Sequence, residues 1–342
     1  MASGAFLKNV WQVAAFSREI VPGVPFARTL CNVALVMYRT RAGKLVVMDD
    51  RCAHRNAPLS LGKVVGDTLQ CGYHGACFDA AGTCVSVPGQ AVISQHARVP
   101  TYPIVERHKL AWIWLGDAAN ADASLIPDIL WMDSPEWVCS EGYTVVAAHY
   151  QLLIDNLLDL SHETYVHGKT IGHDAVAESP VTVEETPGQV IVKKDMPDCT
   201  PPPFYQHAGR LAPTDRVDRW QRTTFTPPAI CVIDVGVNPL PPVREGAVRV
   251  GGQVINLIAP ETDTTSHYFW AFARDCRLDE PALTEYLRAA VEATFAEDEV
   301  MLEAQQKRVN HPTAPTFDVA FKTDVGPNRA RKMVARMLAA EQ

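Results

Sequence analysis

One stretch near the middle of the chain reads Asp155-Asn156-Leu157-Leu158-Asp159-Leu160-Ser161-His162-Glu163-Thr164-Tyr165-Val166-His167. Its two aspartates and its first histidine are spaced i, i+4 and i+7, so on a helix they share one face. The second histidine falls off that face, and we expect the helix to end or loosen before it. The apolar residues in between predict a buried helix, in which charge and imidazole require partners.

Two interpretations of this stretch are open at this point. Two histidines joined by one carboxylate from elsewhere in the chain would form the facial triad that leaves iron(II) open positions for oxygen and substrate. The alternative is a buried helix whose polar residues pair only with one another.

The composition is that of an ordinary globular protein. With 342 residues the chain can form two domains or one large one, and 47% hydrophobic with 20% charged residues is usual for a soluble enzyme. A net charge of -8 argues against a nucleic-acid-binding surface. Nine cysteines without a disulfide-framework spacing, no recognisable signal peptide and no long apolar run predict a cytoplasmic protein.

A second set of metal-binding residue types lies in the first third of the chain. Cys52-Ala53-His54 and Cys71-Gly72-Tyr73-His74-Gly75 each supply one thiolate and one imidazole, and sixteen residues separate them. A [2Fe–2S] cluster with two cysteines on one iron and two histidines on the other requires this ligand set. Tetrahedral zinc also takes two cysteines and two histidines, but zinc fingers usually pair cysteine with cysteine and histidine with histidine. The mixed pairs therefore favour the iron–sulfur cluster.

The pattern of apolar runs and turns predicts strands before and after these motifs. Residues 33–48 read as a hairpin, and we place a domain boundary in the Ala-, Asp- and Pro-rich segment that follows residue 117, giving domains 1–117 and 118–342. A strand is expected over 141–150, a hairpin over 182–195 with its turn at Pro187-Gly188, and further strands over 219–225, 231–237, 249–258 and 266–272. One long helix is expected over 281–309. An antiparallel sheet with long helices is an α+β fold.

The long predicted helix offers the carboxylate that the two histidines lack. Glu297, Asp298 and Glu299 lie on it, more than a hundred positions beyond His167. Because helix surfaces are rich in acids, spacing alone does not choose among the three.

Beyond these patterns, the chain resembles a known family. Cys52-Ala53-His54-Arg55-Asn56-Ala57-Pro58-Leu59-Ser60 and Cys71-Gly72-Tyr73-His74-Gly75 are similar to the two cluster loops of Rieske non-haem iron oxygenases, with Ala53 where many members have proline. The likeness is greatest to the vanillate O-demethylase oxygenases and runs over almost the whole chain. It implies an N-terminal all-β Rieske [2Fe–2S] domain and a C-terminal, helix-grip-like antiparallel sheet domain that holds a mononuclear iron.

The resemblance also implies roles for single residues. It makes Cys52, His54, Cys71 and His74 the cluster ligands. It makes Asp298 the third ligand of the mononuclear iron, with His162 and His167.

Three further residues receive roles from the resemblance alone. Asn156 would lie near the iron, and Asn256 would contact substrate. Asp159 would bridge to a cluster histidine of the neighbouring subunit in a head-to-tail homotrimer, so that each iron receives electrons from the adjacent chain.

The function implied is O-demethylation of a methoxylated benzoate, vanillate giving protocatechuate and formaldehyde. O2 is consumed, and electrons come from NADH through a separate reductase with flavin and [2Fe–2S]. Isovanillate, veratrate, syringate and 4-toluenesulfonate are alternative substrates. Arg219, Arg222 and His267 are available to pair with an aromatic acid, although each is a common residue type on a strand or surface.

Two other classes of protein have to be weighed. One is a Rieske electron carrier, which the large second domain with its own metal motif argues against. The other is a zinc-stabilised binding protein without catalysis, which the mixed Cys–His pairs argue against.

Overall fold

The computed structural model describes residues 6–309, 311 and 319–341. The chain divides into two compact units, the first ending at Pro127 and the second beginning at Asp128, apart from short returns near residues 261–263 and 341. The domain limits 1–117 and 118–342 stay a prediction. Among the described residues, no helix is long and apolar enough to cross a membrane.

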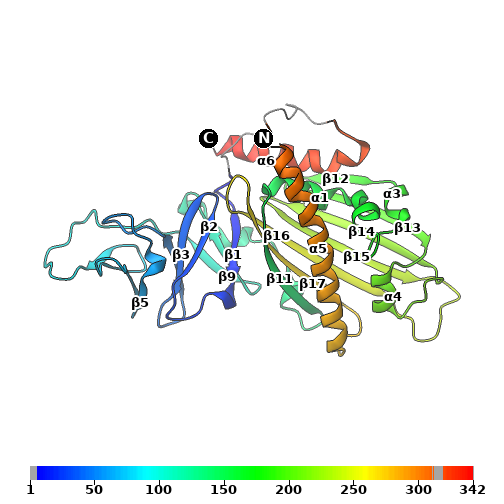
Figure 1. The fold of residues 1–342 in the computed structure, drawn as a ribbon, viewed down its shortest axis with the longest axis horizontal. Coiled ribbons are helices and arrows are strands. Elements are labelled where there is room, and N and C mark those ends of the chain that lie inside the picture. The colour runs from blue at the N-terminus through cyan, green and yellow to red at the C-terminus, as the bar shows by residue number, and fades with distance from the viewer. Residues whose placement is uncertain (1–5, 310, 312–318, 342) are drawn as a thin grey trace. The chain divides into compact units, whose positions relative to one another are not determined.

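The first unit consists of three small antiparallel sheets (Figure 1). They are β1 (Trp11–Phe16), β10 (Leu110–Trp114) and β9 (Ile104–Arg107); β2 (Phe26–Leu30), β3 (Val33–Arg39) and β4 (Leu45–Asp49); and β5 (Lys63–Val65), β6 (Thr68–Gln70), β7 (Cys77–Phe78) and β8 (Cys84–Ser86). The predicted hairpin over residues 33–48 is confirmed as β3 and β4, whose turn contains Gly43 at a φ of 82°. Short 3-10 helices connect these strands and lead to the second unit: η1 (Ser17–Glu19), η2 (Leu59–Leu61), η3 (Ala118–Asn120), η4 (Ala123–Leu125) and η5 (Leu130–Met132).

The second unit is built on one seven-stranded antiparallel sheet, ordered β11-β17-β16-β15-β14-β13-β12. Its strands are β11 (Val138–Val146), β12 (Thr182–Thr186), β13 (Gln189–Cys199), β14 (Val217–Thr226), β15 (Ile230–Pro239), β16 (Val250–Pro260) and β17 (Ser266–Arg274). The predicted α+β fold is confirmed. One limit was wrong: the strand predicted over 141–150 ends at Val146, because the His149 side chain accepts a hydrogen bond from the Gln151 amide and starts a helix.

The helices of this unit carry or adjoin the candidate ligands of the mononuclear iron. They are α1 (Tyr150–Leu158), η6 (Leu160–His162), α2 (Glu163–Val166), α3 (Asp174–Glu178), α4 (Pro203–Gly209), α5 (Pro281–Val309), η7 (Lys322–Asp324) and α6 (Val325–Ala340). The long helix predicted over 281–309 is confirmed as α5, which crosses the sheet in Figure 1. Helices α1 and α5 contact each other, and this brings the two histidines and the acidic run of α5 into one region.

Candidate metal centre

The histidine pair is positioned by a break in the helix that precedes it. Helix α1 ends at Leu158, and Asp159 leaves the helical conformation at φ -114° and ψ 85°. Its carboxylate Oδ1 accepts hydrogen bonds from the Ser161 amide at 3.1 Å and from the Ser161 hydroxyl at 2.6 Å, which starts η6. The predicted loosening before His167 is thus confirmed, but the shared helix face predicted for Asp155, Asp159 and His162 was wrong, because the helix ends between them.

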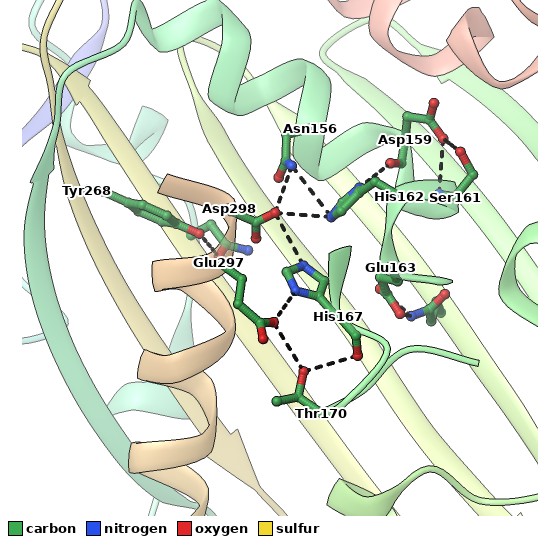
Figure 2. Close-up of polar contacts among 12 residues, drawn as sticks. Asn156, Asp159, Ser161, His162, Glu163, His167, Thr170, Tyr268, Glu297 and Asp298 are labelled. Carbon is green, nitrogen blue, oxygen red and sulfur yellow. Dashed lines mark hydrogen bonds and ion pairs between the residues drawn. The ribbon is translucent and has the colours of Figure 1, made fainter. Parts of the chain in front are cut away.

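Three side chains converge at one point of this unit. The Nε2 atoms of His162 and His167 lie 3.4 Å and 3.2 Å from Asp298 Oδ1 (Figure 2). Ligand atoms of the three residues all lie within 4.8 Å of one another, and no other such group of three or more was found among the described residues. Two imidazoles and one carboxylate in this arrangement form the donor set of a non-haem iron(II) facial triad.

The protonation of the imidazoles suits a metal. His162 donates from Nδ1 to the Asp159 carbonyl at 2.7 Å, and His167 donates from Nδ1 to Glu297 Oε2 at 2.7 Å, because both partners only accept. In its neutral form each imidazole therefore has its lone pair on Nε2, the atom that a metal beside Asp298 would bind in place of a proton.

Without a metal, Asp298 and the two imidazoles act on each other's protonation. Burial would lower the pKa of His162 and of His167, but the hydrogen bond and charge of Asp298 raise both. Burial alone would raise the pKa of Asp298, but the two imidazoles lower it well below its usual range. The carboxylate is therefore ionised and available as a ligand at neutral pH.

The structure separates the three acids of α5. Asp298 faces the histidines, and Asn156 Nδ2 donates to its Oδ1 at 3.0 Å. The position of Asn156 near the iron stays a prediction. Glu297 binds the far nitrogen of His167. Glu299 has Thr144 as its hydrogen-bond partner rather than either histidine.

A cavity adjoins the three converging side chains. His162, His167 and Asp298 form part of its wall. Most of the remaining wall is apolar: it consists of leucine, isoleucine and valine side chains together with the aromatic residues Phe204, Tyr205, Phe272 and Phe295. An apolar, aromatic-lined pocket of this kind suits a small aromatic molecule.

Of the three residues proposed to pair with an aromatic acid, only Arg219 lines the cavity. Arg222 is exposed beside Asp195 and Asp234. His267 is buried, and its Nδ1 shares a hydrogen bond with the Tyr143 hydroxyl at 2.9 Å.

Asn256 is not among the residues that line the cavity. It is fully buried, donates to the Cys231 carbonyl at 2.9 Å, and accepts from the Tyr268 hydroxyl at 2.7 Å. Its amide is thus already bonded within the protein, and a direct contact with substrate stays a prediction that this geometry does not favour.

Sequence reasoning missed a buried polar group on the cavity wall. Glu163 Oε2 accepts from Arg219 at 3.0 Å, and both Glu163 oxygens accept from Gln221 Nε2. Alternate residues of β14 are buried, and this pattern places Arg219 and Gln221 on one face of the strand. No sequence pattern distinguished Glu163, which lies between the two candidate histidine ligands.

The Cys–His loops of the first unit share one backbone pattern. The Cys52 amide donates to the Ala57 carbonyl and the Cys71 amide to the Ala76 carbonyl, each at 2.8 Å. Both cysteines are buried, whereas His54 and His74 are exposed with ring centroids 4.8 Å apart. The two loops together supply two thiolates and two imidazoles, which is the ligand set of a Rieske [2Fe–2S] cluster.

Comparisons with known proteins agree with both sites. Residues 10–103 match the Rieske [2Fe-2S] domain, and residues 146–340 match the vanillate O-demethylase oxygenase C-terminal domain. The toluene-4-sulfonate monooxygenase system iron-sulfur subunit of Comamonas testosteroni is 38% identical over 98% of both chains. The vanillate O-demethylase oxygenase subunit of Pseudomonas sp. (strain HR199 / DSM 7063) is 39% identical over 98% of this chain and 96% of its own.

A solved structure supports the same assignment. Dicamba monooxygenase bound to dicamba superposes with a TM-score of 0.89 at 30% identity, covering 98% of this chain and 99% of its own. A match that extends over both units excludes a lone electron carrier and a zinc-stabilised binding protein. The chain therefore belongs to the vanillate O-demethylase family of Rieske oxygenases, with a [2Fe–2S] cluster and a mononuclear non-haem iron as its cofactors.

Proposed function

We propose that this chain is the terminal oxygenase component that O-demethylates a methoxylated benzoate, with vanillate giving protocatechuate and formaldehyde. The observation that carries the proposal is the convergence of His162, His167 and Asp298 beside an aromatic-lined cavity. Such a site can hold an aromatic ring with one substituent directed at the metal position.

Each metal has a proposed set of ligands. Cys52 and Cys71 would hold one iron of the cluster, and His54 and His74 the other. The two histidines and Asp298 of the second unit would hold the mononuclear iron. When bound, the cluster supplies electrons singly and the mononuclear iron supplies the capacity to activate O2.

The protein side chains orient the ligands and exclude water. Asn156 holds the Asp298 carboxylate, and the Asp159 carbonyl holds the His162 ring. The aromatic wall keeps the ring of the substrate in an apolar environment. One oxygen atom of O2 is inserted into a C–H bond of the methoxy group, and the other is reduced to water, which consumes two electrons and two protons. The product is a hemiacetal, which breaks down to formaldehyde and the phenol.

We further propose that the electrons come from NADH through a separate reductase with flavin and [2Fe–2S], and that the chains form a head-to-tail homotrimer. Asp159 would link His162 to a cluster histidine of the neighbouring chain. Its carbonyl, rather than its carboxylate, contacts His162, and its carboxylate Oδ1 is bonded to Ser161. In the proposed electron-transfer route, the Asp159 carboxylate would therefore contact the cluster histidine of the neighbouring chain, and its carbonyl would contact His162.

Other substrates have direct support from relatives. Proteins named for toluene-4-sulfonate and dicamba are nearly as similar to this chain as those named for vanillate. The name of the toluene-4-sulfonate relative supports 4-toluenesulfonate as an alternative substrate. Isovanillate, veratrate and syringate are further alternatives because they are aromatic methyl ethers like vanillate.

The experiment combines purified protein, a competent reductase, NADH and O2 with each of these five compounds. We expect formaldehyde and protocatechuate from vanillate in equal amounts. Turnover of 4-toluenesulfonate or another compound with none of vanillate would replace the substrate within the same family. No turnover of any compound by protein with both metal sites loaded would contradict the proposal.

A further inference from the structure

The two histidines beside Asp298 differ in what holds their second ring nitrogen. His162 donates from Nδ1 to an uncharged main-chain carbonyl, that of Asp159. His167 donates from Nδ1 to a carboxylate, that of Glu297, at the same distance of 2.7 Å. The two imidazoles are therefore chemically unequal before any metal binds.

Glu297 is held in place for this contact. It lies on α5 directly before Asp298. The Glu297 carboxylate contacts Nδ1 of His167, whereas the Asp298 carboxylate lies beside Nε2 of the same ring (Figure 2). Thr170 Oγ1 lies 3.5 Å from Glu297 Oε2 and 3.3 Å from the His167 carbonyl, at the turn that follows the histidine. The His167 side chain is 1% exposed and that of Glu297 33%, so the carboxylate lies between a buried ring and the surface.

A carboxylate behind a ligand imidazole has two physical effects. It fixes the ring orientation and the tautomer that leaves Nε2 unprotonated, and its charge makes the imidazole a stronger electron donor. A carbonyl has the first effect and a weaker form of the second. Loss of such a partner typically lowers metal affinity or activity by roughly 10- to 100-fold.

We infer that Glu297 is a positioning residue for the mononuclear iron, acting through His167. This inference rests on the iron site of the proposed function but not on its substrate. Glu297 was one of three candidate ligands by sequence, and the geometry gives it this separate role.

The neighbouring glutamate provides a matched control. Glu299 lies on the other side of Asp298 in the same helix and has the same side chain, but its hydrogen-bond partner is Thr144. Replacing Glu299 by Gln changes the charge of α5 equally without changing either histidine. A general electrostatic effect of α5 would appear in both variants, whereas a positioning effect appears only at Glu297.

The experiment measures iron binding rather than turnover. Protein that retains its cluster but is depleted of mononuclear iron is titrated anaerobically with Fe(II) against a competing chelator, for wild type, Glu297→Ala, Glu297→Gln and Glu299→Gln. We expect Glu297→Ala to weaken Fe(II) binding by roughly 10- to 100-fold and Glu297→Gln by less, because its carbonyl still accepts from Nδ1. Glu299→Gln should bind Fe(II) like wild type.

A spectroscopic readout separates positioning from loss of folding. The visible spectrum of the cluster should be the same in all four proteins, while the EPR signal of the nitric oxide adduct of Fe(II) should change only in the Glu297 variants. Wild-type Fe(II) affinity and an unchanged signal in Glu297→Ala would overturn the inference, as would equal effects at Glu299. Because neither measurement requires substrate or reductase, failure to demethylate vanillate would leave this result standing.

Discussion

At the scale of single residues, Glu163 and Arg219 form a neutral ion pair in the wall of the cavity. Glu163 and Arg219 have side-chain exposures of 6% and 1%, and Gln221 donates to both oxygens of the same carboxylate. Arg219 also donates to the Ile171 carbonyl at 3.1 Å, in the loop after His167. The pair thus connects β14 to the segment that carries both histidines, and its main role is to hold that segment.

Removing one member of this pair should lower the stability of the folded protein. We expect Arg219→Met to lower the free energy of unfolding of the loaded protein by about 3–5 kcal/mol, since it leaves Glu163 buried without its cation. Denaturant unfolding followed by circular dichroism measures this. The double variant Glu163→Gln with Arg219→Met should recover part of the loss, and a single variant as stable as wild type would show that the pair does not hold the segment.

At the scale of elements, α6 is attached to α1 by a second carboxylate–guanidinium contact. Arg331 of α6 donates to both carboxylate oxygens of Asp155, and Gln151 donates to the same group at 3.0 Å. Burial raises the pKa of Asp155, although Arg331 and Gln151 act against that change. Since α1 also carries Asn156, which holds Asp298, the C-terminal helix supports the metal site from outside.

Two arginines of α6 allow a matched test of this support. We expect Arg331→Met to lower the free energy of unfolding by about 1–3 kcal/mol and to lower the mononuclear iron content, because it removes a charged hydrogen-bond partner of half-buried Asp155. Arg336, whose partner Glu185 lies at the surface, should tolerate the same change with a loss below about 1 kcal/mol. Equal losses in stability and iron content for the two variants would contradict a specific role for α6.

At the scale of the whole molecule, the two metal motifs lie in different compact units of the chain. The cluster loops belong to the first unit and the residues around Asp298 to the second. The proposed head-to-tail trimer would place each cluster against the iron site of an adjacent chain. If electrons pass between chains, a chain with an intact cluster can supply a neighbouring chain that has an intact iron site.

Two inactive variants should restore activity in a mixed trimer. Cys52→Ala removes a cluster ligand, and His162→Ala removes an iron ligand, so each protein alone should be inactive. In trimers co-expressed in equal amounts, about a quarter of the subunit contacts would pair an intact cluster with an intact iron. We expect a corresponding fraction of wild-type turnover, and mixed trimers of verified composition without activity would exclude transfer between chains.

The sequence by itself determined the donor set of the cluster and the histidine pair of the second metal site. Cys52, His54, Cys71 and His74 lie in two short loops, where spacing along the chain already limits the distance between donors. The two histidines of the 155–167 stretch are also local, and the turn between them was predicted from their mismatch with helical periodicity. Ligands that lie near one another in sequence are constrained by backbone geometry alone, which is why local motifs were sufficient.

Only the tertiary structure decided which distant residues join them. Three consecutive acids on α5 point in directions about 100° apart, so the packing of α5 against α1 selects Asp298 for the metal position and Glu297 for His167. The same holds for Glu163, whose burial depends on β14 lying opposite, and for Asn256, whose amide is bonded to neighbouring strands. Contacts across long sequence separations depend on how helices and strands pack, and one local pattern is compatible with many such packings.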